Sequence, residues 1–157
     1  MFAFQNYDIE PDILVVGKGL GGSLYPVSAV IARPEYNICG DISLVHYTHE
    51  KSPLGCAVGL ALIEYIEKED ILGHVMELSA LMKRRAEDMK KKYEAVGDVR
   101  LIGALLGIEL VKSRKTREKA VDEAEKILYE CLENGLSFKI SQGNVLTLAP
   151  PLIITEE

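Results

Sequence analysis

The sequence EPDILVVGKGLGG, from Glu10 to Gly22, places a short apolar run directly before a glycine-rich turn. The run Asp12 to Val16 (DILVV) has the aliphatic, β-branched composition of a strand. A second β-type run, from Val27 to Ala32, follows shortly afterwards. We therefore predict two strands joined through a turn in which a single lysine, Lys18, stands between glycines.

Three kinds of site use a turn of this type. A P-loop requires a serine or threonine after its lysine, whereas Gly19 follows here. A dinucleotide-binding fingerprint requires the glycines to open a helix, whereas Ser23 to Pro26 should lead into a strand. The third possibility is a lysine that forms a Schiff base with an aldehyde, because flanking glycines leave its amine accessible. On composition and spacing alone, a solvated loop lysine remains the simpler explanation.

The composition describes one globular domain or slightly more. The chain has 157 residues, of which 48% are hydrophobic and 27% charged, and its net charge of -6 argues against binding nucleic acid. The longest apolar stretch, Leu54 to Leu62, is much shorter than the ~20 residues that span a bilayer. No cleavable signal pattern opens the sequence. The three cysteines, Cys39, Cys56 and Cys131, are widely spaced and odd in number, which indicates reduced thiols in a cytoplasmic protein.

After the second strand, the sequence predicts a polar loop and then mostly helix. Turn-forming residues dominate from Arg33 to Ser52, and Ser52-Pro53 is a typical helix start. The remaining elements are expected in a fixed order: a helix beginning after Asp70, a hairpin of Val99–Leu101 and Ala104–Val111 bent at Gly103, a helix over Ala120–Leu132 ended by Asn134-Gly135, and strands at Leu136–Ile140 and Val145–Leu148.

These elements predict a fold between α/β and α+β with two parts. Residues 1–69 read as part of a larger domain with a connecting helix, because two strands cannot close a sheet of their own. Residues 70–157 read as a small α+β domain. This second part is expected to be truncated, since Ile153 to Glu157 resembles the start of a capped helix.

Four blocks together resemble the class III aminotransferases, the family of 4-aminobutyrate, ornithine and acetylornithine aminotransferases and dialkylglycine decarboxylase. The first is Glu10 to Pro26, similar to the family's catalytic-lysine segment. The others are Thr48 to Ala57, the segment Val96 to Arg100 with Gly103 and Gly107 to Leu110, and Ala149 to Leu152. They occur in family order and cover essentially the whole chain. The resemblance implies the carboxyl-terminal part of a pyridoxal-phosphate (PLP) transferase of fold type I, the edge of the large domain plus the small domain.

The resemblance also implies roles for three residues. Lys18 matches the lysine that binds PLP covalently and transfers the substrate proton. Thr48 matches the threonine whose hydroxyl and amide bind the cofactor phosphate, in this family across the interface of a homodimer. Arg100 matches the arginine that grips a substrate carboxylate, for which a planar guanidinium is suited.

Several features depart from the family pattern. Leu101 stands where glycine usually follows the arginine, which would crowd the carboxylate site, and Ser23 replaces a common glycine. The charged loop holds His46, His49 and Glu50, but one loop with no distant third ligand does not predict a metal site. The family's phosphate-binding glycine loop, ring-stacking aromatic and ring-nitrogen aspartate precede the lysine and have no counterpart here. We therefore expect this chain alone to be a weak or inactive catalyst.

The expected activity of the longer parent protein is transfer of an amino group from an ω-amino acid, such as 4-aminobutyrate, to a 2-oxo acid. Another acceptor specificity of the ornithine or acetylornithine type, or a decarboxylating variant, remains open. A different class of alternative is a non-catalytic domain that associates with itself or with a partner.

Overall fold

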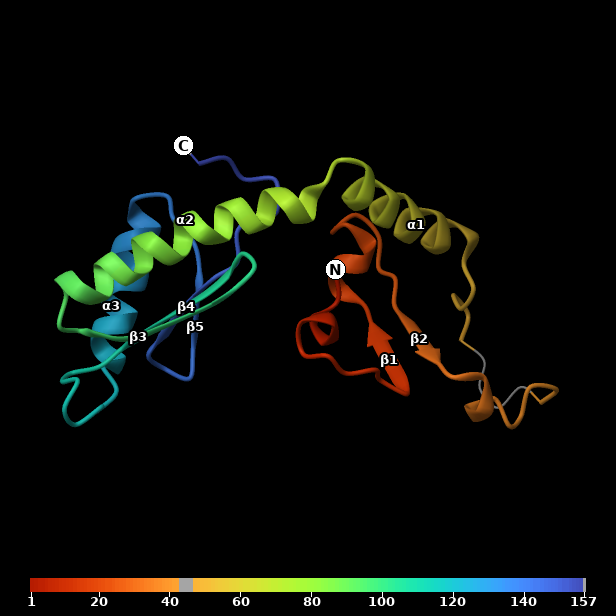
Figure 1. Cartoon of the computed structure of the whole chain (residues 1–157), viewed down its shortest axis with the longest axis horizontal. Coiled ribbons are helices and arrows are strands. Elements are labelled where there is room, and N and C mark those ends of the chain that lie inside the picture. The colour runs from red at the N-terminus through yellow and green to blue at the C-terminus, as the bar shows by residue number, and fades with distance from the viewer. Residues whose placement is uncertain (43–46, 157) are drawn as a thin grey trace. The chain divides into compact units, whose positions relative to one another are not determined.

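The computed structural model describes residues 1–42 and 47–156 and divides the chain into two compact units (Figure 1). The units are Met1–Asp70 and Ile71–Glu157. The assignment of these units to part of a large domain and to a small domain stays a proposal.

In its described residues, 1–42 and 47–70, the first unit contains one two-stranded antiparallel sheet and one long helix. Strand β1 (Ile13–Val16) pairs with β2 (Ala29–Ala32), and α1 spans Pro53–Lys68. Three short 3₁₀ turns complete it, at Ala3–Asn6, Lys18–Gly21 and Pro34–Tyr36. The predicted helix start is confirmed, since Ser52 Oγ accepts a hydrogen bond from the amide of Gly55 at 3.4 Å.

The first unit has almost no buried core among its described residues. Among its described residues only three glycines are buried, Gly21, Gly55 and Gly59. The facing strand residues Val15 and Val30 remain 72% and 67% exposed. Uncovered apolar strand faces of this kind are characteristic of a sheet that is buried by further protein.

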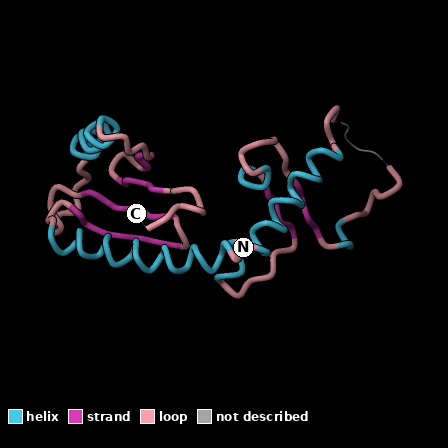
Figure 2. Tube along the Cα trace, turned by 90° about the horizontal axis from the view of Figure 1, so that it is seen from above, coloured by secondary structure: helices cyan, strands magenta, loops and turns pink. Residues whose placement is uncertain are grey.

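The second unit is a four-stranded antiparallel sheet with two helices. Its elements are α2 (Ile71–Lys92), β3 (Val96–Ile102), β4 (Leu105–Leu110), α3 (Val121–Glu133), β5 (Lys139–Ser141) and β6 (Val145–Leu148). The strand order is β3-β4-β6-β5, and Figure 2 shows α2 running alongside these strands. The β3–β4 hairpin turns at Gly103, as the sequence predicted, and the φ of Gly103 is +54°, a left-handed geometry that glycine adopts readily.

Side-chain alternation divides the hairpin into an apolar face and a polar face. Leu106, Ile108 and Leu110 of β4 are buried and share one core cluster with Ala86 of α2 and Ala124 of α3. The residues between them, Gly107 and Glu109, lie on the opposite face. The one buried polar side chain in the described core, Asn144, donates to the Leu110 carbonyl at 2.7 Å.

Some predicted boundaries were wrong. The segment Leu136–Ile140 was predicted as a strand, but β5 begins only at Lys139. The amide of Leu136 instead donates to the carbonyl of Cys131, which extends the end of α3. Strand β2 likewise begins at Ala29, two residues later than expected. In the described part of the chain, no helix has the length and apolarity needed to cross a membrane.

A substitution at Gly97 tests the close packing of β3 against Val111. A Cβ added at Gly97 would lie 2.8 Å from both methyl groups of Val111, which is 2% exposed. Because valine is stiff at χ1, we expect Gly97→Ala to lower the free energy of unfolding by about 1–3 kcal/mol in urea titrations. Gly107→Ala is the matched control, since its Cβ would meet Val145 Cγ1 at an ordinary 3.4 Å. Equal stability of the two variants would contradict this packing.

Candidate active site

Lys18 stands at a backbone position that few non-glycine residues adopt. Strand β1 ends at Val16, Gly17 remains extended, and Lys18 then has a φ of +51° at the start of the 3₁₀ turn. Gly22, with a φ of +60°, ends the turn, and its amide donates to the Gly19 carbonyl at 2.9 Å. The sequence predicted a turn without a helix, whereas the chain makes one 3₁₀ turn. That single turn is too short to act as a helix N-terminus for a dinucleotide.

The glycines of this turn allow two segments to approach closely. A Cβ at Gly17 would lie 3.3 Å from Ser28 Cβ, and a Cβ at Gly21 would lie 3.3 Å from Val27 Cγ1. Larger residues at these two positions would push the turn away from the chain that enters β2. At Gly19, by contrast, an added Cβ would meet nothing within 4 Å, so the backbone beside Lys18 faces open space.

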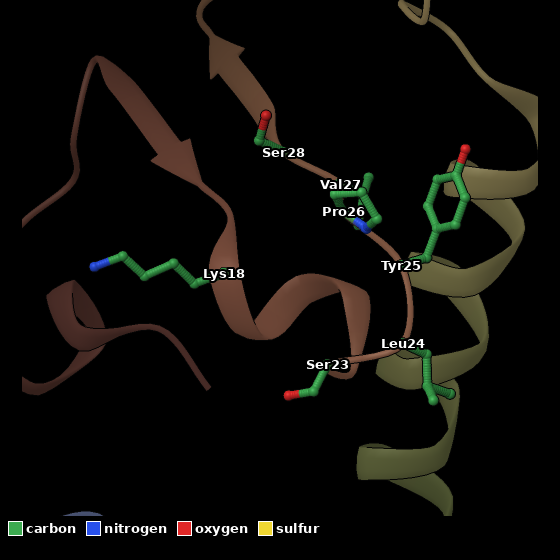
Figure 3. Close-up of a pocket in the computed structure, with 7 residues that line it drawn as sticks. All are labelled: Lys18, Ser23, Leu24, Tyr25, Pro26, Val27 and Ser28. Carbon is green, nitrogen blue, oxygen red and sulfur yellow. The ribbon is translucent and has the colours of Figure 1, made fainter.

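A hollow of about 530 Å³ adjoins Lys18, and Ser23, Leu24, Tyr25, Pro26, Val27 and Ser28 complete its lining. In Figure 3 the side chain of Lys18 extends away from α1, whereas Tyr25 lies beside that helix. Tyr25 fits there because Gly55 has no side chain: a Cβ at Gly55 would lie 3.3 Å from Tyr25 Cε1. The packing of Tyr25 on α1 therefore holds the loop in place on one side of the hollow.

Thr48 lies elsewhere in the first unit. It is exposed in a turn whose other residues, Tyr47, His49 and Glu50, line a second hollow of about 730 Å³ together with Tyr25–Ser28. Neither Thr48 nor Lys18 is among the described residues that line this second hollow. The structure thus places Lys18 and Thr48 beside the same loop but not in a common cavity.

No group of three or more metal-ligating side chains is found among the described residues. His46, which was considered with His49 and Glu50 on the basis of the sequence, lies outside those residues.

Arg100 lies on the polar face of β3, in the second unit. Its Nη1 donates to Asp98 Oδ2 at 2.9 Å and to Glu109 Oε2 at 2.7 Å. The hydrogen bond from Lys90 (3.0 Å to Asp98 Oδ1) is the main reason that the pKa of Asp98 lies below its usual value. The hydrogen bond to Glu109 is the main reason that the pKa of Arg100 is raised.

Leu101 does not crowd this face, contrary to the expectation from the sequence. Alternation along β3 turns its side chain toward the core, where it packs partly buried against the apolar cluster. The substitution of leucine for the family's usual glycine is therefore accommodated on the face opposite Arg100.

A recess of about 370 Å³ adjoins Arg100, and its lining includes Lys90, Asp98, Glu109, Arg114 and Arg117. Arg114 donates to the carbonyls of Lys90, Tyr93 and Val96, which satisfies groups at the end of α2 and at the start of β3. Sequence reasoning missed Asp98, Glu109 and Arg114. The i, i+2 spacing of Asp98 and Arg100 was a usable signal, but the cross-strand partner requires the register of the hairpin.

Comparison with known proteins assigns the family. The family described as "Aminotransferase class-III" matches the chain over residues 1–157. The chain belongs to the class III aminotransferase family. The expected fold class is confirmed by the taurine:2-oxoglutarate aminotransferase from Bifidobacterium kashiwanohense, solved in complex with PLP and glutamate. It superposes on 99% of this chain and 36% of its own with a TM-score of 0.89 and 28% identity.

Curated relatives within the family carry different activities. The (R)-1-hydroxy-2-aminoethylphosphonate ammonia-lyase of Vibrio splendidus is 53% identical over 98% of this chain and 32% of its own length. The leucine/methionine racemase of Thermococcus litoralis is 42% identical over 99% of this chain and 35% of its own length. This class III aminotransferase chain therefore spans about a third of the length of the curated relatives it matches.

The charge cluster at Arg100 predicts a pH-dependent stability. A carboxyl whose pKa is lowered by folding stabilises the protein above its unfolded pKa of about 4, and this contribution is lost as pH falls through the folded pKa. We expect Asp98→Asn to lower the free energy of unfolding at pH 7 by up to about 1 kcal/mol, because the side chain is 44% exposed.

The deficit of this variant should shrink as pH falls below the unfolded pKa and vanish once Asp98 is protonated in both states. Urea unfolding at several pH values measures the difference. Asp88→Asn is the control, since that carboxylate pairs with the exposed Lys91 on the outer face of α2. A deficit of constant size at all pH values would argue against the ionic origin of the effect.

Proposed function

We propose that the protein to which this chain belongs is a PLP-dependent enzyme that removes a proton from the amine-bearing carbon of a small amino compound. The observation that carries the proposal is Lys18, in a left-handed position between glycines and beside a hollow. The family membership of the whole chain supports it. Lys18 binds the cofactor aldehyde through its amine and then holds or returns the substrate proton.

The residues beside Lys18 suit a flat, anionic cofactor. The hollow of about 530 Å³ lies within the range of small-molecule sites, roughly 300–1,000 Å³. The open space beside Gly19 lets a ring approach the backbone, and Ser23 and Ser28 supply hydroxyls to the lining. When bound, PLP supplies an electron-accepting ring that stabilises negative charge on the neighbouring carbon.

The remaining residues have supporting roles in the proposal. Thr48 binds the cofactor phosphate of the partner subunit in a homodimer, which agrees with its place outside the hollow of Lys18. Arg100 binds a substrate carboxylate. The protein acts in the cytoplasm. The chain by itself is a weak or inactive catalyst. Among its described residues only Lys18 and residues 23–28 line the hollow, and these few residues do not surround a cofactor.

Two fates of the substrate are compatible with the same proton removal. The first is transfer of the amino group from an ω-amino acid to a 2-oxo acid, supported by the likeness to the Bifidobacterium aminotransferase. The second is release of ammonia from a small amine with a hydroxyl on the adjacent carbon: the proton and the hydroxyl leave as water, and hydrolysis of the resulting imine frees ammonia. The 53% identity to the Vibrio lyase supports it. A transferase requires a 2-oxo acid to complete its cycle, whereas a lyase turns over without one. The labelling experiment below tests the non-catalytic alternative, and analysis of the products tests the decarboxylating one.

Covalent labelling tests the role of Lys18. We expect PLP followed by borohydride to label one peptide, residues around Lys18, in the longest natural form of the protein. Lys18→Ala should abolish this label and at least 99% of activity, because no other amine is placed beside the hollow among its described lining residues. Lys68→Ala, an 82% exposed lysine at the end of α1, is the control and should keep the label. Labelling scattered over surface lysines would support the non-catalytic alternative.

Product analysis separates the two fates. A transferase should form a new amino acid from 2-oxoglutarate in equal amount to the amine consumed, and should stop after one turnover without it. A lyase should release free ammonia over many turnovers in the absence of any 2-oxo acid. Incubating the full-length protein and PLP with 4-aminobutyrate or 1-hydroxy-2-aminoethylphosphonate, whose hydroxyl can leave from the adjacent carbon as water before hydrolysis releases ammonia, then measuring ammonia and amino acids, distinguishes these results. Neither product with either amine would oppose both candidates.

A further inference from the structure

The guanidinium of Arg100 is held from two strands through a single nitrogen. Asp98 lies two residues before Arg100 on β3, and Glu109 on β4 pairs directly with Asp98 in the ladder. Both carboxylates accept hydrogen bonds from Nη1. Among the described residues, Nε and Nη2 make no hydrogen bond. The two acidic side chains therefore fix the direction of the guanidinium and leave its other edge open.

The hairpin register makes this arrangement possible. Gly107 pairs with Arg100, so no side chain stands across the ladder from the arginine. The arginine side chain can then lean over β4 to reach Glu109, which is diagonal to it. A larger residue opposite Arg100 would compete for that space. The carboxylates of Asp98 and Glu109, which face each other, are kept apart by the guanidinium between them.

These ion pairs contribute little to stability by themselves. The side chains of Asp98, Arg100 and Glu109 are 44%, 54% and 29% exposed. Exposed pairs are typically worth only about 0–1 kcal/mol. Orientation of the guanidinium is therefore the larger consequence of placing two carboxylates on one nitrogen.

The adjoining recess has a surplus of positive charge. Its charged lining residues are Lys90, Arg100, Arg114 and Arg117 against Asp98 and Glu109. Lys90 is paired with Asp98, and Arg114 donates to the carbonyls of Lys90 and Tyr93 at the end of α2 and of Val96 at the start of β3. The open edge of Arg100 and the exposed Arg117 remain to meet an anion that enters. A carboxylate is the matching ligand for a guanidinium edge, since its two oxygens accept two parallel hydrogen bonds.

We infer that Asp98 and Glu109 are positioning residues: by anchoring Nη1 they present the Nε–Nη2 edge of Arg100 to a substrate carboxylate. The inference rests on the substrate role of Arg100 in the proposed function. Two other roles for Asp98 and Glu109, competition with the substrate and stabilisation of the sheet, predict different results. If the acids competed with the substrate for Arg100, removing one would strengthen substrate binding. If they only stabilised the sheet, removing one would affect all substrates alike.

The test uses the full-length protein with PLP and two matched amines, 4-aminobutyrate and n-butylamine, which lacks the carboxylate. Glutarate, which has carboxylates and no amine, is the binding probe in calorimetry. The variants are Glu109→Gln, Glu109→Asp and Arg100→Lys. The control is Glu118→Gln, a similar glutamate whose carboxylate pairs with Lys112 at 2.6 Å and does not line the recess.

We expect Glu109→Gln to raise the KM for 4-aminobutyrate and the Kd for glutarate roughly 3- to 10-fold, the size of one weakened charged hydrogen bond. The kcat and both constants for n-butylamine should stay unchanged. Glu109→Asp should recover most of the loss, and Arg100→Lys should weaken glutarate binding at least as much as Glu109→Gln. Glu118→Gln should behave as the wild type.

Other outcomes overturn the inference. A lower KM for 4-aminobutyrate in Glu109→Gln would make Glu109 a competitor, and equal changes for both amines would make its role structural. A wild-type protein that binds no glutarate would also overturn it. If Arg100→Lys leaves glutarate binding intact, the substrate role of Arg100 fails. Labelling of Lys18 remains a separate test of the proposed function.

Discussion

The absence of side chains at Gly17 and Gly21 is the constraint on which the candidate site depends. These two positions let the turn after β1 lie against Val27 and Ser28, at distances where an added Cβ would already be tight. The loop Ser23–Ser28 is thereby drawn beside Lys18, and Tyr25 anchors it on α1. A lysine in a long flexible loop would lack this fixed loop beside its backbone. The glycine pattern thus supplies close packing as well as conformational freedom.

In the second unit, the alternation of side chains along the β3–β4 hairpin places the core residues on one face and the charged residues on the other. Leu106, Ile108 and Leu110 of β4 point into the core with α2 and α3. Glu109, which alternates with them, lies on the charged face with Arg100. A one-residue slip in register would exchange the two sets. The left-handed turn at Gly103 and the buried Asn144, bonded to the end of β4, both oppose such a slip. The geometry of the arginine cluster is therefore tied to the same register that builds the core.

Much of the fold could be predicted because local signals agreed with the final structure. The Ser52-Pro53 start of α1, the Gly103 hairpin and the Asn134-Gly135 end of α3 are each set within a few residues. The errors occurred where tertiary contacts decide, as at Leu136, which extends a helix end instead of starting a strand. The same limit explains the site. Lys18 and Arg100 could be found from motifs, whereas Glu109 became visible only through its cross-strand pairing.

The exposed sheet of the first unit and the different activities named for its relatives bear on where reaction specificity is determined. Proteins named as an aminotransferase, an ammonia-lyase and a racemase all contain a region similar to this chain, so likeness in this region does not by itself identify the activity. A lysine that moves one proton serves each of them. The exposed faces of β1 and β2, at Val15 and Val30, leave this sheet uncovered within the described part of the first unit, as expected of a sheet that further protein covers. The residues that select between transfer, elimination and racemisation are then best sought in the protein that covers that sheet.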